Sequence, residues 1–405
     1  CVLNLSGKVK RIQRMEYRKF RADQLFDGYR LYATDNVLIT DETGVVKDIV
    51  STAEAGDDVQ QFTGTLSPGL INAHCHLELS HLKNVIPPHT GLIEFLCSVV
   101  TKRGFEQELI QQEIAKAEEE MYNNGIVAVG DIGNTADTAL VKSKSRIRWQ
   151  NFVEVLSFTD AKANENFNHY QTVADELESA LRTSHIAHRT LLVPHAPYSI
   201  SPKTFQLINE ATADQIISIH NQEHPAENIL YETGGGEYLK LFKIFGIDSS
   251  PFPVTGKSSI RSYLPYFNKK QTIFLIHNTY MPEEDIVWAN EYAAANGLKL
   301  IYCLCINANL YIENNTPPLA LLLKHNCSVV LGTDSYSSNW QLSIAKEMEA
   351  LLKHTSLTKE QALQMATLNG AKALQWDDQL GSFEKGKQPG IVLLSEDFSV
   401  SKRLL

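Results

Sequence analysis

The chain has 405 residues, of which 43% are hydrophobic and 21% charged, a composition typical of a globular protein with a large core. Its net charge is −10 at pH 7 and no dense run of lysine and arginine occurs, so neither nucleic acid nor an anionic membrane is expected as a partner. No apolar stretch approaches the roughly 18 residues that a membrane helix needs. The stretch from Cys1 to Lys10 shows no signal-peptide pattern, and whether Cys1 is the natural start is left open.

The cysteine content indicates a reducing compartment. Six cysteines are few for this length, and their spacing does not form a disulfide scaffold. We therefore expect a cytoplasmic protein. The sequence does not determine the oligomeric state, and it is compatible with a homodimer.

The two ends of the chain differ from its middle. From about Arg18 to Thr65 the sequence shows short strand-like pieces with turn signals between them, and after Gly381 a Gly/Pro-containing turn leads into the apolar run Ile391–Leu394. We predict that residues 1–65 and 378–405 pair into one small β-sandwich domain.

The middle of the chain alternates between short apolar runs and longer amphipathic stretches. Several runs are almost continuously apolar, as expected for parallel strands buried on both faces. The intervening stretches have helical spacing, for example Ile110, Ile114, Ala117 and Met121, and Thr358 is placed to cap another helix. We predict an α/β fold with a (β/α)8 TIM barrel over residues 66–377. The eight predicted strands are 66–76, 126–132, 152–156, 191–195, 216–220, 273–277, 300–305 and 329–334.

Polar residues end most of these predicted strands. Because all strand carboxyl ends of such a barrel meet at one rim, their side chains are candidates for one site. Imidazoles with one carboxylate suit a borderline divalent metal such as zinc, or iron or manganese. The residues are His74 and His76 after the first strand, His195 after the fourth, His220 after the fifth, His277 after the sixth and Asp334 after the eighth.

Two local patterns in this set carry different weight. At positions i and i+2 of a strand, His74 and His76 project to the same face, although a His-x-His pair by itself is weak evidence. Glu223 follows His220 by three residues, so it is either an acid that moves protons beside the metal or a surface loop acid.

The motifs together resemble the amidohydrolase superfamily, in its cytosine/guanine/adenosine deaminase-like branch, which also holds chlorohydrolases. The resemblance covers most of the chain, from about Ser67 to Gly386. Its elements are Pro68-Gly69-Leu70-Ile71-Asn72-Ala73-His74-Cys75-His76, His195-Ala196-Pro197-Tyr198, His220 with Glu223, His277-Asn278 and Gly332-Thr333-Asp334-Ser335.

This resemblance implies a barrel with a small β-sandwich and a specific division of roles. His74, His76, His220 and Asp334 would ligate one metal, whose bound hydroxide attacks a ring carbon of the substrate. His277 would hold and polarise the attacking water, Glu223 would shuttle a proton, and His195 would contact the substrate. The fourth predicted strand ends in no lysine of the kind that bridges two metals in binuclear relatives, so one metal is implied.

Two features bear on the substrate. Cys305-Ile306-Asn307-Ala308-Asn309 departs from the branch's usual Cys-Pro-x-Ser-Asn on the active rim. Leu77-Glu78-Leu79-Ser80 resembles the corresponding segment of aminodeoxyfutalosine deaminases. Glu78 is therefore either a substrate contact on a purine edge or ribose hydroxyl, or a loop acid that binds backbone amides.

We predict a mononuclear metal-dependent hydrolytic deaminase that releases ammonia from an amino-substituted heterocycle or nucleoside, with 6-amino-6-deoxyfutalosine as one candidate substrate. One alternative keeps the metal and changes the leaving group, as in a chlorohydrolase or a cyclic amidohydrolase. An alternative of another class is a barrel retained as a scaffold without catalysis.

Overall fold

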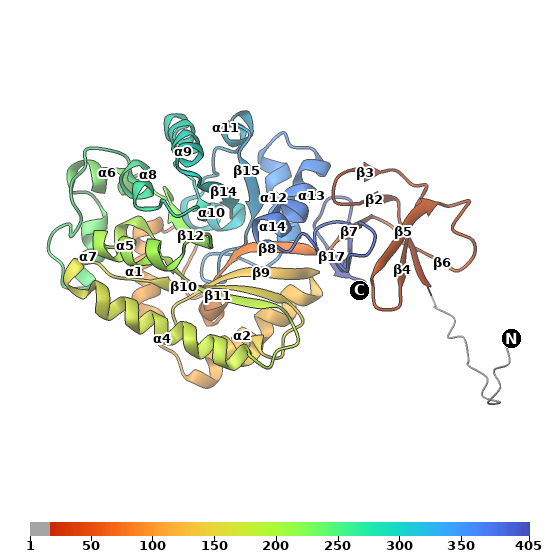
Figure 1. Ribbon diagram of the computed structural model, residues 1–405, viewed down its shortest axis with the longest axis horizontal. Helices are drawn as coiled ribbons and strands as arrows, with labels where there is room; N and C mark the ends of the chain where they lie inside the picture. The colour runs from red at the N-terminus through yellow and green to blue at the C-terminus, as the bar shows by residue number, and fades with distance from the viewer. Residues whose placement is uncertain (1–16) are drawn as a thin grey trace.

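A computed structural model describes residues 17–405 of the chain (Figure 1). The questions raised about Cys1 lie outside the described residues. No helix within the described part is long and apolar enough to cross a membrane.

Two small β-sheets lie at one end of the molecule, on the right of Figure 1. The first has the order β5-β4-β1-β6 and the second the order β17-β16-β7-β2-β3, so the second joins strands from both ends of the chain. Ile391–Leu394 forms β16, as predicted, and pairs antiparallel with β7. The bounds are β1 Tyr17–Arg21, β2 Gln24–Phe26, β3 Leu31–Tyr32, β4 Asn36–Asp41, β5 Val46–Ser51, β6 Val59–Gln61, β7 Thr65–Pro68, β16 Ile391–Leu394 and β17 Ser401–Arg403.

The eight predicted barrel strands are present, in two parallel four-stranded sheets of order β11-β10-β9-β8 and β12-β13-β14-β15. Both faces are buried along most of their length, which explains why several of them are nearly continuously apolar. The strands are β8 Leu70–Cys75, β9 Ile126–Gly133, β10 Arg148–Val155, β11 His188–Pro194, β12 Ile216–Asn221, β13 Thr272–His277, β14 Lys299–Leu304 and β15 Ser328–Leu331.

The first predicted strand needs a correction. Residues 66–76 are two strands, because β7 pairs in the small sheet and β8 pairs with β9 in the barrel. The chain changes sheets at Gly69, where an added Cβ would lie 2.3 Å from Val127 Cγ1 and 2.6 Å from the carbonyl oxygen of Pro389. The missing side chain of Gly69 therefore allows the close passage from one sheet to the other.

Hydrogen bonds join the two four-stranded sheets on both sides. The backbone N–H of His220 donates to the carbonyl of His195 (3.0 Å), which connects β12 to the end of β11. The N–H groups of Thr333 and Asp334 donate to the carbonyl of His74 (2.9 and 3.0 Å), which connects the end of β15 to β8. On both sides, these hydrogen bonds involve predicted site residues, namely His195 and His220 on one side and His74 and Asp334 on the other. The contacts that close the barrel therefore also position the site.

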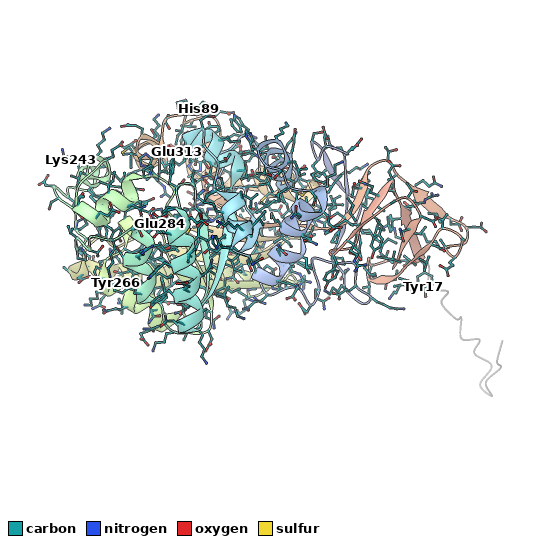
Figure 2. The ribbon with its side chains drawn as sticks, turned by 90° about the horizontal axis from the view of Figure 1, so that it is seen from above. Tyr17, His89, Lys243, Tyr266, Glu284 and Glu313 are labelled. Carbon is teal, nitrogen blue, oxygen red and sulfur yellow. The ribbon has the colours of Figure 1, made fainter. Side chains whose placement is uncertain are left out.

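Helices cover the outside of the strands (Figure 1). The predicted amphipathic stretch is α2, and Thr358 caps α13 by accepting a hydrogen bond from the N–H of Gln361. The bounds are η1 Leu77–Leu82, α1 Leu92–Lys102, α2 Gln107–Asn123, α3 Ala139–Lys142, η2 Asp160–Lys162, α4 Ala163–Leu181, η3 Pro197–Ser199, α5 Pro202–Ala211, α6 Ala226–Thr233, α7 Tyr238–Ile244, α8 Ser259–Tyr263, η4 Leu264–Tyr266, α9 Glu283–Asn296, α10 Ile306–Glu313, α11 Leu319–Lys324, α12 Ile344–His354, α13 Lys359–Ala366 and α14 Leu368–Ala373. In Figure 2, Tyr17 of the small sheets and Lys243 of α7 lie at opposite ends of the molecule.

Candidate active site

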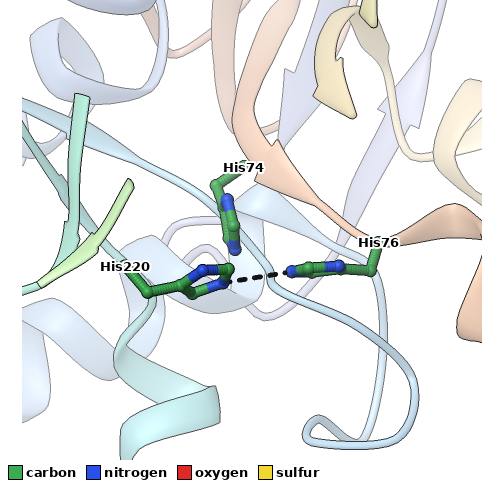
Figure 3. Close-up of side chains that lie close together, drawn as sticks. All are labelled: His74, His76 and His220. Carbon is green, nitrogen blue, oxygen red and sulfur yellow. Dashed lines mark hydrogen bonds between the residues drawn. The ribbon is translucent and has the colours of Figure 1, made fainter. Parts of the chain in front are cut away.

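Three histidine side chains meet at the carboxyl ends of β8 and β12. Figure 3 shows the rings of His74, His76 and His220 pointing toward one another. Nε2 of His76 lies 3.3 Å from Nε2 of His220, and one nitrogen from each of the three rings lies within 4.8 Å of the others. All three rings are buried.

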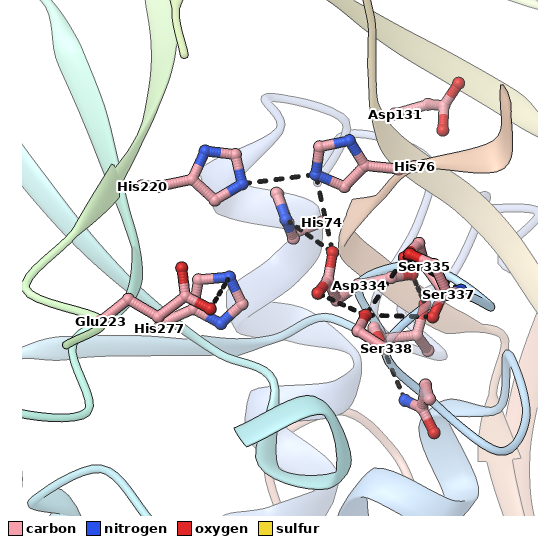
Figure 4. A network of polar contacts seen from close by, with 12 residues as sticks. His74, His76, Asp131, His220, Glu223, His277, Asp334, Ser335, Ser337 and Ser338 are labelled. Atoms are coloured by element: carbon pink, nitrogen blue, oxygen red, sulfur yellow. Dashed lines mark hydrogen bonds and ion pairs between the residues drawn. The ribbon is translucent and has the colours of Figure 1, made fainter. Parts of the chain in front are cut away.

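Asp334, in the segment after β15, completes this cluster (Figure 4). Its Oδ1 lies 3.5 Å from Nε2 of both His74 and His76, while its Oδ2 accepts a hydrogen bond from Ser338 Oγ at 2.6 Å. Burial raises the pKa of this carboxyl, but His76, His277 and Ser338 outweigh burial, and the pKa is lowered overall. Asp334 is therefore an ionised carboxylate that faces the histidines.

Three residues at or next to the site have a strained backbone conformation. His277 and Asp334 have φ angles of 71° and 57°, and Gln222, next to Glu223, has a φ of 43°. Residues other than glycine rarely adopt this left-handed conformation, which costs of order 1 kcal/mol each and collects at functional sites. The surrounding packing holds these side chains in positions that an unstrained strand end would not give.

The partners of the Nδ1 atoms give His220 and His277 different hydrogen-bonding states. Nδ1 of His220 lies 2.7 Å from the carbonyl oxygen of His195, so this nitrogen carries the proton and Nε2 presents a lone pair to the cluster. Nδ1 of His277 faces the side-chain amide of Asn309 at 3.4 Å. With the amide donating, Nδ1 of His277 is the acceptor and Nε2 carries the proton. His220 is thus prepared to bind a metal and His277 to donate a hydrogen bond.

The residues present fit a divalent metal. Both ring nitrogens of His74 are buried with no hydrogen-bond partner, an arrangement that is costly unless something else occupies the lone pair. Burial, with a smaller effect of the neighbouring histidines His220 and His195, lowers the pKa of His74 well below its usual value, so the ring is neutral. Neutral imidazoles and one carboxylate are the ligand set of many zinc sites.

Glu223 and His277 lie directly beside the cluster and face one another in Figure 4. Oε1 of Glu223 is 3.6 Å from Nε2 of His277. The glutamate is only 4% exposed, and burial followed by the nearby carboxylates of Asp334 and Glu227 raises its pKa well above the usual value. The surface-loop interpretation of Glu223 is therefore wrong, because this acid is buried beside the cluster.

One pocket of about 850 Å³, counted out to the solvent at its mouth, opens onto these residues. His195, which immediately follows β11, lines it, as does Glu78 of η1. Apolar side chains from α1, α7 and the segment after β10 form another part of its wall, among them Leu92, Phe95, Leu96, Phe158 and Leu241.

Glu78 is held by the protein on both oxygens. Its Oε2 accepts hydrogen bonds from the N–H groups of Asn134 and Thr135 and from Thr135 Oγ1 (3.0, 3.1 and 2.8 Å). Its Oε1 lies 3.4 Å from Arg103 Nη2. These contacts match the loop-acid interpretation of Glu78, and its predicted contact with the substrate stays a prediction.

Residues 65–403 match the model of the amidohydrolase family. The chain belongs to this family. The metal-dependent hydrolase of C–N bonds predicted from the sequence is thereby confirmed at the level of the family.

Curated relatives of this amidohydrolase include two kinds of deaminase. The chain is 28% identical over 346 residues to a 5-methylthioadenosine/S-adenosylhomocysteine deaminase of Teredinibacter turnerae, covering 81% of this chain and 71% of the relative. It is 24% identical over 377 residues to a 5'-deoxyadenosine deaminase of Methanococcus maripaludis, covering 87% of this chain and 81% of the relative.

Solved structures support the fold of the amidohydrolase. The Helicobacter pylori aminofutalosine deaminase, in complex with methylthio-coformycin, superposes with a TM-score of 0.77 at 21% identity, covering 96% of this chain and 97% of the other. A zinc-bound adenosine deaminase of Xanthomonas campestris gives a TM-score of 0.72 at 21% identity, covering 94% and 84%. These similarities confirm the barrel with its small β domain.

Sequence reasoning missed two residues of the amidohydrolase site. Glu154, at the second-to-last position of β10, lines the pocket, and Asn309 of α10 contacts the ring of His277. A polar residue near the end of an apolar strand is the signal that could have marked Glu154. Asn309 belongs to a segment that was noted only for its departures from the family motif.

Replacing Gly332 with alanine is expected to damage the metal cluster. A Cβ at this position would lie 2.7 Å from the Cβ of His74 and 2.9 Å from its backbone nitrogen and oxygen, so His74 must move. We expect a loss of about 1–3 kcal/mol in the free energy of unfolding and a lower metal content. Gly104→Ala is the control, since nothing lies within 4 Å of its added Cβ. Equal metal content in the two variants would contradict this role of Gly332.

Glu227 is expected to make stability depend on pH. Its Oε1 accepts a hydrogen bond from the N–H of Gln222 (2.9 Å), and burial raises its pKa to about 7. The folded chain therefore holds a proton that the unfolded chain releases at lower pH. This contribution to stability is complete below the ordinary glutamate pKa and is lost as the pH rises through about 7.

The measurement compares Glu227→Gln with the wild type by denaturant unfolding between pH 5 and pH 8. The variant stays neutral, so it should gain up to about 3 kcal/mol relative to the wild type over this range. Glu232→Gln, on the exposed part of α6, is the control. A difference between Glu227→Gln and wild type that does not change with pH would show that Glu227 does not titrate on unfolding.

Proposed function

We propose that this amidohydrolase is a mononuclear metal-dependent hydrolytic deaminase of adenosine-type nucleosides. The proposal is carried by one arrangement, in which three neutral histidines and an ionised aspartate converge beside a buried glutamate and a histidine N–H donor. The relatives named as deaminases of methylthioadenosine, S-adenosylhomocysteine and 5'-deoxyadenosine support the substrate class. The residues are His74, His76, His220 and Asp334 as ligands, with Glu223 and His277 beside them.

In such a reaction a ring carbon gains oxygen from water, its bond to the amino nitrogen breaks, ammonia leaves and a carbonyl remains. When bound, a metal at this site supplies a Lewis acid that brings the pKa of a water to about 7. Glu223 takes the proton that the attacking water gives up and delivers it to the ring nitrogen next to the reacting carbon. It then carries the proton of the added hydroxyl to the departing amine as the carbonyl forms. The Nε2–H of His277 hydrogen-bonds the oxygen that is added to the ring.

Zinc is the proposed metal, with iron and manganese as the alternatives. Three imidazole nitrogens and one carboxylate oxygen match its usual ligands, and the solved adenosine deaminase of similar fold is described as zinc-bound. Elemental analysis of the purified protein distinguishes the three metals.

The pocket supports a nucleoside with an extended substituent. The polar cluster lines one part of it, and apolar side chains line another, with Phe95 and Leu241 among them. An apolar wall would accommodate a group attached to the sugar, and His195 and Glu78 remain the proposed substrate contacts. Aminodeoxyfutalosine, proposed from the segment Leu77–Ser80, is one candidate among such nucleosides.

The deciding experiment measures ammonia release and metal content in parallel. The panel comprises adenosine, 5'-deoxyadenosine, 5'-methylthioadenosine, S-adenosylhomocysteine, aminodeoxyfutalosine and guanine. Ammonia release from at least one adenosine-type nucleoside by metal-loaded protein is expected. Mass spectrometry of the product separates deamination from loss of chloride or opening of a cyclic amide. A metal-loaded protein that releases no ammonia from any of them would overturn the proposal, and a protein that binds no metal would favour a scaffold.

A further inference from the structure

Glu154 is a buried acid in the pocket that the proposed chemistry does not use. It lies on β10, is 4% exposed, and lines the pocket together with His195 and Asn134. A carboxylate oxygen of Glu154 lies within 4.8 Å of ring nitrogens of His195 and His220. The acid is therefore close to the cluster, on the His195 side of the pocket.

The two oxygens of Glu154 have different environments. Oε1 accepts a hydrogen bond from Nδ2 of Asn134 at 3.0 Å. Oε2 is buried and has no hydrogen-bond partner. A buried carboxylate oxygen without a donor is costly, since the group has given up its hydration without replacement.

Neighbouring contacts hold the amide of Asn134 in one orientation. Its backbone N–H donates to Glu78 Oε2 (3.0 Å), and its Oδ1 accepts from Arg103 Nη2 (3.1 Å). The amide NH2 is thereby directed at Glu154, so Oε1 stays occupied. Oε2 is therefore the oxygen of Glu154 that is left without a donor.

We propose that Oε2 of Glu154 binds a ribose hydroxyl of the substrate and makes the site selective for nucleosides over free bases. This inference rests on the proposed function. The ring nitrogens of an adenosine-type substrate accept hydrogen bonds. Apart from the reacting amine, the sugar hydroxyls are the donors common to this class, and an acceptor such as Oε2 needs a donor.

Glu154→Gln tests this hydrogen bond directly. The amide of Asn134 donates to Oε1, so the glutamine must present its own oxygen there and its NH2 at the position of Oε2. The substitution keeps the shape of the side chain and turns the acceptor in the pocket into a donor. A hydroxyl that rotates to accept from this NH2 replaces a charge-assisted hydrogen bond by a weaker neutral one, whereas a ring nitrogen would gain a partner.

The experiment compares adenosine with 2'-deoxy-, 3'-deoxy- and 5'-deoxyadenosine in the wild type and in Glu154→Gln, each as kcat/KM for ammonia release. We expect a loss of about 10–100-fold on adenosine and less than about threefold on the analogue that lacks the bound hydroxyl. The ratio between substrates is measured within one preparation, so it does not depend on how much of the variant folds. Glu118→Gln, a buried acid on α2 that bonds Ser145 away from the pocket, is the control for losing a buried charge.

Two outcomes would overturn the assignment while leaving the proposed function intact. One is an equal loss on all four nucleosides, which indicates a general structural role of Glu154. The other is unchanged or improved activity on adenosine, which indicates a contact with a ring nitrogen or none. A wild-type protein that releases no ammonia from any of the nucleosides would instead overturn the proposed function, and this assignment with it.

Discussion

Replacing His74 with alanine is expected to remove both the bound metal and the activity. The ring lies at the centre of the cluster, with Asp334 Oδ1 at 3.5 Å and no hydrogen-bond partner on either nitrogen. Alanine offers no ligand atom, and the ligands that stay cannot complete a four-coordinate site. Elemental analysis should show a fall from about one metal per chain to nearly none, and kcat/KM for ammonia release should fall by at least about 10³-fold.

The control for this variant is His354→Ala, at the exposed end of α12. It should keep the metal content and kcat/KM of the wild type. Asp334→Asn provides a second test, because it removes the negative charge that the cluster presents while keeping the size of the side chain. Full metal content and activity in His74→Ala would rule out the ligand set proposed for this enzyme.

Glu223→Gln is expected to stop catalysis without releasing the metal. The buried acid lies beside Nε2 of His277 and has a raised pKa, whereas an amide of the same shape cannot give up or take a proton at neutral pH. We expect kcat to fall about 10²–10⁴-fold, the range usual for losing a general acid or base, with KM and metal content close to the wild type. Steady-state kinetics and elemental analysis on the same preparation provide these values.

Glu118→Gln is again the control, because it also removes a buried acid. It should keep the kcat of the wild type. A Glu223→Gln variant with nearly normal kcat would assign the proton transfers to another group. A variant that has also lost its metal would show that Glu223 acts through the cluster and does not move protons itself.

The sequence by itself determined the order of the barrel strands and the ends at which polar residues gather. Strands buried on both faces must be apolar along their length, so hydropathy locates them. Parallel strands bring their carboxyl ends to one rim, and this explains why His74, His277 and Asp334, far apart in the chain, meet in the structure. The exception was the run 66–76, where both halves are apolar and buried, so hydropathy did not mark the change of sheet at Gly69.

Only the tertiary structure decided what each polar group faces. The proton positions on His220 and His277 depend on a carbonyl of the neighbouring strand and on the amide of Asn309, and neither contact has a periodic signal in the sequence. Oε1 of Glu154 has a donor and Oε2 has none, and this depends on how Glu78 and Arg103 hold the amide of Asn134. Hydropathy and spacing place backbone elements, whereas hydrogen-bond partners are set by contacts between distant residues once the barrel has closed.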